Sequence, residues 1–277
     1  MKCTRYLQWP LIVILFLTLS AYEDIPEPTG EEAPTRPFIW HDLVTPDLDA
    51  SKKFYESVFG WTFKDIKVKG LRLAGIYSGG TRIGGVIEVP RANQAVWIKL
   101  IPVNDLEQRV DMVKQNGGRV ILPPANIPGR GTQVVLEGAE GEEFAFIGNV
   151  DPAFSGGGMA DKHPLAWSEL WADDPATSKS FYETAFGVAT NDQEVDGKPY
   201  WVFENNGEKI AGMIENPITN QGTQWVPYVL VSDPSGVVER AEQGGAFIVL
   251  EPAEDIRDGK FGIFQDPAGA IVCVQKK

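Results

Sequence analysis

Two short stretches of the chain place an aromatic ring and a carboxylate two residues apart. Trp40 precedes Asp42 in WHDL, and Trp167 precedes Glu169 in WSEL. Side chains alternate along a strand, so residues two apart lie on one face. Indole rings stack on flat ligands and attract cations, and a carboxylate adds a charge-assisted hydrogen bond. The pattern predicts a site for a small apolar or cationic organic molecule.

The same residues also allow a structural interpretation. Aromatic residues on strands often fill a protein core instead of lining a binding site. The two carboxylates would then pair with arginines, and the chain would be an interaction module filled by its own aromatic side chains. The candidate partners are Arg72, Arg82 and Arg130.

Few other side chains offer metal-binding or nucleophilic chemistry. The sequence has two histidines, His41 and His163, and two cysteines, Cys3 and Cys273. His41 follows Trp40 directly, so it points to the opposite face of the strand. His163 stands in a Gly-rich stretch typical of a linker. Cys273 lies in an apolar strand, where a thiol is more often part of the core than a ligand or nucleophile.

The chain repeats itself. FYESVFG at 54–60 returns as FYETAFG at 181–187, and GVIE at 85–88 returns as GMIE at 212–215. So many matches in nearly one register indicate a tandem duplication.

Each copy has the pattern of a strand, a helix and three strands, present twice. Asp47 and Asp174 are N-cap residues, apolar residues follow at helical spacing, and Gly60 and Gly187 end the two helices. The pattern predicts an α+β fold with two βαβββ units per copy. In the first copy we expect strands at 38–45, 61–68, 71–78, 82–89, 95–103, 119–122, 132–137 and 143–147, and helices after Asp47 and at 105–116.

The N-terminal residues have the layout of a secretory signal peptide. Lys2 and Arg5 precede an apolar run at 11–19, which is shorter than the roughly 20 residues that span a bilayer. We expect cleavage after Ala21 and a secreted or periplasmic protein, with an uncleaved membrane tether as the alternative. The local sequence resembles a lipoprotein box with Tyr22 in place of the lipid-carrying Cys.

The rest of the chain divides into two domains and two linkers. A Pro- and Glu-rich stretch predicts a disordered stalk, and three consecutive glycines predict an interdomain linker. The net charge of −13, without a basic patch, argues against nucleic acid or a membrane surface as partner and leaves a small molecule. The expected boundaries are 1–21 for the signal peptide, 22–37 for the stalk, 38–148 for the first domain, 149–164 for the linker and 165–277 for the second domain.

The repeated motif resembles the vicinal oxygen chelate (VOC) superfamily, which includes glyoxalase I, the bleomycin resistance proteins and the type I extradiol dioxygenases. The matching pattern is Asp-x-x-x-Ser-x-x-Phe-Tyr-x-x-x-Phe-Gly at 47–60 and again at 174–187. The resemblance covers about 38–148 and 165–275. It implies that each pair of βαβββ units forms a cup-shaped mixed sheet with helices outside, and that related enzymes hold a divalent metal in this cup.

The positions that carry the superfamily's metal ligands are filled differently here. An indole nitrogen has no lone pair to give, and a metal needs three or four converging donors. We therefore expect no metal cofactor. By resemblance, the ligand positions fall on Trp40 and Trp167, on Ile98 and Val226, and on Ala145 and Cys273, with Glu88 and Glu215 as the acids nearest to the remaining position.

The sequence thus predicts a glyoxalase-like protein that has lost the standard metal site and binds a small organic ligand in one or both cups. The alternative is a metal-dependent lyase or extradiol-type dioxygenase that uses displaced ligands such as Asp42, Glu88 or His41, with a divalent metal as cofactor. The candidate cup residues are Trp40, Asp42, Ile98, Trp167, Glu169, Val226, Tyr228 and Cys273.

Overall fold

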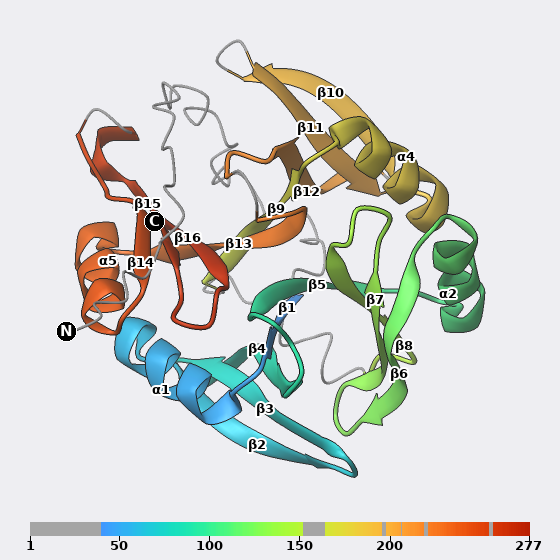
Figure 1. Cartoon of the computed structure of the whole chain (residues 1–277), viewed down its shortest axis with the longest axis horizontal. Coiled ribbons are helices and arrows are strands. Elements are labelled where there is room, and N and C mark those ends of the chain that lie inside the picture. The colour runs from blue at the N-terminus through green and yellow to red at the C-terminus, as the bar shows by residue number, and fades with distance from the viewer. Residues whose placement is uncertain (1–39, 152–163, 196–197, 206, 219–220, 255–256) are drawn as a thin grey trace, which may run out of the picture.

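The structure, a computed structural model, describes residues 40–151, 164–195, 198–205, 207–218, 221–254 and 257–277. The expected signal peptide, the stalk and His163 lie outside these residues, as does most of the linker. Among the described residues, no helix is both long and apolar enough to cross a membrane. The described part forms two eight-stranded mixed sheets with helices packed outside them (Figure 1).

The first sheet contains the first copy of the repeat. Its strand order is β2-β3-β4-β1-β5-β8-β7-β6, with β1 parallel to β4 and antiparallel to β5, so the two βαβββ units join along β1 and β5. The elements are β1 Trp40–Thr45, α1 Leu48–Phe59, β2 Thr62–Val68, β3 Leu71–Ser78, β4 Thr81–Glu88, β5 Val96–Pro102, α2 Leu106–Gln115, β6 Arg119–Ile127, β7 Gly131–Glu137 and β8 Glu143–Gly148.

The second sheet repeats this topology in the order β10-β11-β12-β9-β13-β16-β15-β14. The predicted α+β fold of two βαβββ units per copy is therefore confirmed. The elements are β9 Leu165–Ala172, α4 Pro175–Phe186, β10 Ala189–Val195, β11 Lys198–Asn205, β12 Glu208–Glu215, β13 Gln224–Val231, α5 Pro234–Gln243, β14 Phe247–Leu250, the short 3-10 helix η3 Arg257–Gly259, β15 Phe261–Gln265 and β16 Ile271–Lys276.

Helices α1 and α4 begin and end where the sequence predicts. The Asp47 carboxylate accepts hydrogen bonds from the backbone N–H groups of Asp49 at 3.1 Å and Ala50 at 3.0 Å. Gly60 ends α1 in the left-handed region with φ 69°, a conformation that costs glycine little. Asp174 and Gly187 play the same parts in α4.

Strand β6 is longer than expected. The expected bounds are 119–122, but the strand continues through Pro123 and Pro124 to Ile127. It is the edge strand of its sheet, and its pairing with β7 shifts register around the prolines. An edge strand tolerates a missing N–H donor on its outer side, so the prolines do not end it.

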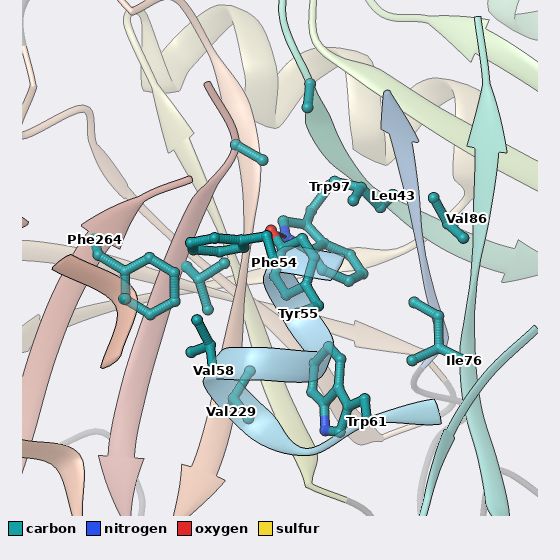
Figure 2. Close-up of a cluster of buried hydrophobic side chains, with 14 of the residues drawn as sticks. Leu43, Phe54, Tyr55, Val58, Trp61, Ile76, Val86, Trp97, Val229 and Phe264 are labelled. Carbon is teal, nitrogen blue, oxygen red and sulfur yellow. Dashed lines mark hydrogen bonds between the residues drawn. The ribbon is translucent and has the colours of Figure 1, made fainter. Parts of the chain in front are cut away.

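The repeated Phe-Tyr helices join the two copies. In Figure 2, Phe54 of α1 points toward Phe264 of the second copy, and Val58 lies in the same cluster as Val229. The Tyr55 hydroxyl donates to Asp266 Oδ2 at 2.9 Å and accepts from the indole of Trp97 at 3.0 Å. The motif residues thus pack between the copies and face away from the cups.

Helix α4 makes the reciprocal contact with the first copy. Its Tyr182 accepts from the indole of Trp225 at 3.0 Å, as Tyr55 does from Trp97. Phe144 and Phe146 of β8 lie against Phe186 with ring centroids 4.9 and 5.0 Å apart. The copies therefore share two related apolar interfaces, one beside α1 and α5 and one beside α2 and α4 (Figure 1).

Candidate functional site: two cups with buried carboxylates

The inner face of the first sheet, here called the first cup, has an apolar floor. Trp40 and Val44 of β1 pack there with Ile98 of β5 and Ala145 of β8. Trp40 is only 1% exposed. Trp40 therefore fills the first cup and does not line an open space.

Asp42 stands on the same face and is fully enclosed by polar partners. Arg130 donates through both terminal nitrogens, at 2.6 Å to Oδ2 and 2.9 Å to Oδ1. Gln133 Nε2 donates to Oδ2 at 2.9 Å, and Trp40 Nε1 donates to Oδ1 at 3.1 Å. Since β1 and β7 are separated by β5 and β8 in the sheet, the curl of the sheet and the length of the arginine bring these groups together.

The charges in the first cup are arranged to keep Asp42 ionised. Burial alone raises the pKa of Asp42, but the charge and hydrogen bonds of Arg130, with those of Gln133 and Trp40, outweigh burial and hold the pKa below its usual 3.8. The guanidinium groups of Arg130 and Arg82 also lie 5.2 and 5.5 Å from the Trp40 ring, within the range of cation–π attraction. The first cup is thus a closed network of opposite charges.

Gly85 of β4 makes room for this network. A Cβ atom at this position would lie 2.4 Å from Asp42 Oδ1 and 2.5 Å from a terminal nitrogen of Arg130. Real Cβ atoms do not approach other atoms so closely, so any side chain here would displace the ion pair. Gly212 occupies the matching position of the second copy, where a Cβ atom would lie 2.0 Å from the Tyr200 hydroxyl.

The inner face of the second sheet, here called the second cup, holds its carboxylate with hydroxyl and indole donors. The Tyr200 hydroxyl donates to Glu169 Oε1 at 3.0 Å. The Tyr228 hydroxyl donates to Oε2 at 2.5 Å, and Trp171 Nε1 lies 3.4 Å from the same oxygen. Trp167 Nε1 donates to the Tyr200 hydroxyl at 3.3 Å, so a chain of hydrogen bonds runs from Trp167 to Glu169.

The cups differ because two positions, one on β15 and one in the turn before it, carry other residues than the equivalent positions of the first copy. Val135 pairs with Ala145 as Ile263 pairs with Cys273, which fixes the equivalence of β7 and β15. In this register Phe261 replaces Gln133 and stacks on Tyr228 at 5.8 Å. Asp258 replaces Arg130 and pairs with the exposed Lys260 at 3.1 Å. The second cup therefore carries a carboxylate where the first cup carries the guanidinium of Arg130.

The two tryptophans also differ in exposure. Trp40 is buried, whereas Trp167 is half-buried and packs at the margin of the second apolar cluster. Val226, Tyr228 and Cys273 form part of that cluster and lie at the floor of the second cup. An aromatic face beside a buried carboxylate thus remains partly open to solvent in the second cup.

The remaining candidates lie elsewhere. His41 is fully buried on the opposite face of β1, where it is the cross-strand partner of Lys99. Glu88 accepts from the backbone N–H of Leu48 at 3.1 Å and from Arg72 at 2.7 Å. These bonds link the end of β4 to the start of α1.

Sequence reasoning missed Gln133, although a long polar side chain directly before the apolar run VVL, inside an expected strand, is a usable signal. Of the three arginines proposed as partners of the carboxylates, Arg130 is the one buried against Asp42.

The residues present do not fit the divalent metal of related enzymes. Three of the four ligand positions carry indole or aliphatic side chains, apart from Cys273. Of the acids nearest to the fourth, Glu88 is engaged by the backbone N–H of Leu48 and by Arg72. The oxygens of Asp42 are occupied by Arg130, Gln133 and Trp40. Within the described ranges, no group of three or more His, Cys, Asp or Glu residues could hold a metal ion.

Two cups, each built from paired βαβββ units with a carboxylate on the first strand, define a tandem protein of the VOC fold. The model of the Glyoxalase/Bleomycin resistance protein/Dioxygenase superfamily matches residues 38–146 and 164–274, and the chain belongs to this superfamily.

Curated relatives extend over most of the chain. It is 30% identical over 256 residues to the "Putative glyoxylase CFP32" of Mycobacterium bovis, covering 86% of this chain and 93% of that protein. It is 27% identical over 253 residues to the "Anthracycline biosynthesis protein DnrV" of Streptomyces peucetius, covering 83% and 90%.

Solved structures show the same fold at low identity. The Mn(II)-bound glyoxalase from Novosphingobium aromaticivorans aligns with a TM-score of 0.55 and 16% identity, covering 88% of this chain and 83% of that one. The 2,3-dioxygenase LapB from Pseudomonas sp. KL28 aligns with a TM-score of 0.55 and 14% identity, covering 87% and 92%.

Proposed function

We propose that this VOC-family chain binds a small organic ligand in its second cup and does so without a metal. The observation that carries the proposal is the contrast between the cups. In the first cup Arg130 neutralises Asp42 and covers Trp40. In the second cup Trp167 stays half-buried next to Glu169, which accepts hydrogen bonds from Tyr200, Tyr228 and Trp171.

The chemistry of the second cup suits a flat apolar or cationic molecule. The Trp167 ring offers a stacking face, and the hydrogen-bond chain through Tyr200 leads to the carboxylate of Glu169. Such a carboxylate attracts a ligand cation or accepts a hydrogen bond from a ligand hydroxyl. The relatives' names, putative glyoxylase and anthracycline biosynthesis protein, both point to small-molecule chemistry.

A thermal-shift screen with small aromatic and cationic compounds tests the proposal. A ligand that binds only the native state must raise the melting temperature. We expect the hits to lose their effect in Trp167→Leu and Tyr200→Phe and to keep it in Ile121→Ala, a half-buried residue at the margin of the first cup. Hits that survive both second-cup substitutions would show that the ligand binds elsewhere.

The alternative function is a metal-dependent lyase or extradiol-type dioxygenase, favoured by the name of the 30% identical relative. Elemental analysis after dialysis, with assays on hemithioacetals and catechols with and without added Ni, Zn, Fe or Mn, separates the two functions. Stoichiometric metal that is lost on substituting Asp42, Glu88 or His41 would replace the metal-free proposal.

We further propose that the protein is exported. The basic start and the apolar run at 11–19 support this. Cell fractionation followed by N-terminal sequencing tests the proposal, with a mature N-terminus at Tyr22 in the secreted or periplasmic fraction as the expected result. An intact Met1 on soluble protein inside the cell would contradict it.

A further inference from the structure

A cavity lies between the two copies, outside both cups. Its volume is about 560 Å³, which is within the size range of small-molecule sites. The first copy contributes β5, α2 and the end of β8, and the second contributes α4, β11, β12 and β13. Its aromatic lining residues are Phe146, Tyr182, Phe186, Phe203 and Trp225.

Comparison of the two interfaces explains why the cavity exists. At the interface beside α1, Trp61 stacks on Phe59 at 4.5 Å and on Tyr55 at 5.8 Å. The repeat places Val188 at the position of Trp61, and Val188 lines the cavity. The smaller side chain leaves open a space that an indole ring fills at the related interface.

The same comparison places a lysine in this cavity. Lys99 occupies the position of Pro227 in the repeat, and it lines the cavity although it is only 4% exposed. Its Nζ donates to Ser168 Oγ at 2.9 Å and to the carbonyl oxygen of Ile210 at 3.2 Å, and it lies 5.6 Å from the Trp225 ring. These partners are all uncharged.

Lys99 forms no ion pair with a carboxylate within the described part of the chain. Burial lowers the pKa of Lys99 to about 7, because the charged form loses its hydration without gaining an anion. An anion bound in the cavity would supply the missing counter-charge and favour the ammonium form. Arg109, at the side of the same cavity, donates to the carbonyl oxygen of Ala185 at 3.2 Å and adds positive charge.

We propose that this interdomain cavity binds a small aromatic carboxylate, with the carboxylate on Lys99 Nζ and the ring against the aromatic wall. Asn104, Asp105 and Gln108, which are exposed, form the mouth at the start of α2. The acidic side chain of Asp105 is at this outer end, where its Oδ1 accepts from the backbone N–H of Gln108 at 2.9 Å. The electrostatic gradient therefore directs a ligand's negative end inward.

Calorimetric titration of the full chain with benzoate, phenylacetate and cinnamate, each compared with its primary amide, tests this proposal. We expect at least one carboxylate to bind at least about tenfold more tightly than its amide, the usual worth of a charge-assisted hydrogen bond. Lys99→Met should abolish this preference. Lys114→Met, which removes an exposed lysine of α2, should keep it.

A second pair of variants tests the proposal even if Lys99→Met fails to fold. Gln108→Trp narrows the mouth from an exposed position and should weaken carboxylate binding, whereas Gln115→Trp, exposed on the same helix outside the cavity lining, should not. Equal binding of acid and amide, or binding unchanged in Gln108→Trp, would overturn the proposal. The absence of binding by any of the carboxylates up to about 10 mM would also overturn it. Because these variants leave Trp167 and Tyr200 intact, failure here does not affect the second-cup proposal.

Discussion

Replacing Asp42 with Asn is expected to destabilise the protein strongly, because it leaves the buried guanidinium of Arg130 without its counter-charge. Arg130 is 1% exposed and Asp42 is fully buried, and two short hydrogen bonds join them. Breaking a buried ion pair by removing one charge costs about 3–5 kcal/mol. For a domain of 150–250 residues each kcal/mol lowers the melting temperature by about 2–4 °C, so the expected loss is on the order of 10 °C.

The tandem repeat supplies a matched control. Glu169→Gln removes the equivalent carboxylate, but the hydroxyls of Tyr200 and Tyr228 are neutral donors that can rotate to bond an amide. The expected cost is about 1–2 kcal/mol. The double variant Asp42→Asn with Arg130→Met should lose less unfolding free energy than the two single variants lose together, since no unpaired charge remains buried.

Calorimetry and urea unfolding at pH 7, followed by near-ultraviolet circular dichroism, give the comparison. The pH dependence gives a second readout. Because the folded pKa of Asp42 lies below its usual 3.8, the ion pair's contribution is present above pH 3.8 and is lost as the pH falls through the folded pKa. Equal losses for Asp42→Asn and Glu169→Gln, or strict additivity in the double variant, would refute the charge-pair reasoning.

Three further results are expected. Gly85→Ala should cost about 1–3 kcal/mol by urea unfolding, because its Cβ would lie 2.4 Å from Asp42; a neutral effect would contradict the close packing. Burial raises the pKa of Glu142 from 4.5 to about 7, so wild-type stability should fall as the pH rises across this interval. In a series of unfolding curves at different pH, Glu142→Gln should flatten that slope, and parallel slopes for the two proteins would refute the reasoning. Asp47→Ala should lower stability by about 1 kcal/mol through loss of the α1 cap, and a change below measurement error would show that the cap is dispensable.

Much of the fold was predictable because its signals are local. Asp47, Gly60 and their counterparts mark helix ends through hydrogen bonds and backbone conformations that span a few residues. Strand alternation placed Trp40 on the face opposite His41 without any knowledge of the tertiary structure. The duplication itself could be read directly from two occurrences of one motif.

The interior of the cups was only partly predictable. The sequence offered Arg72, Arg82 and Arg130 as partners for the carboxylates, and nothing local distinguished them. Arg130 is 88 residues from Asp42 in the chain, and it was the curl of the sheet that brought them together. Arg72 instead bridges the exposed Asp49 and Glu88.

The sequence by itself determined the tandem α+β architecture, the helix boundaries and the side of each strand that faces a cup, because those properties depend on neighbours within about one turn or one pleat. Tertiary structure alone decided that the first cup is closed by an ion pair, that Trp167 stays half-buried, and that Val188 and Lys99 line one cavity between the copies. These features depend on side chains from distant segments converging in three dimensions, and alternation along a strand carries no information about which distant segment lies opposite.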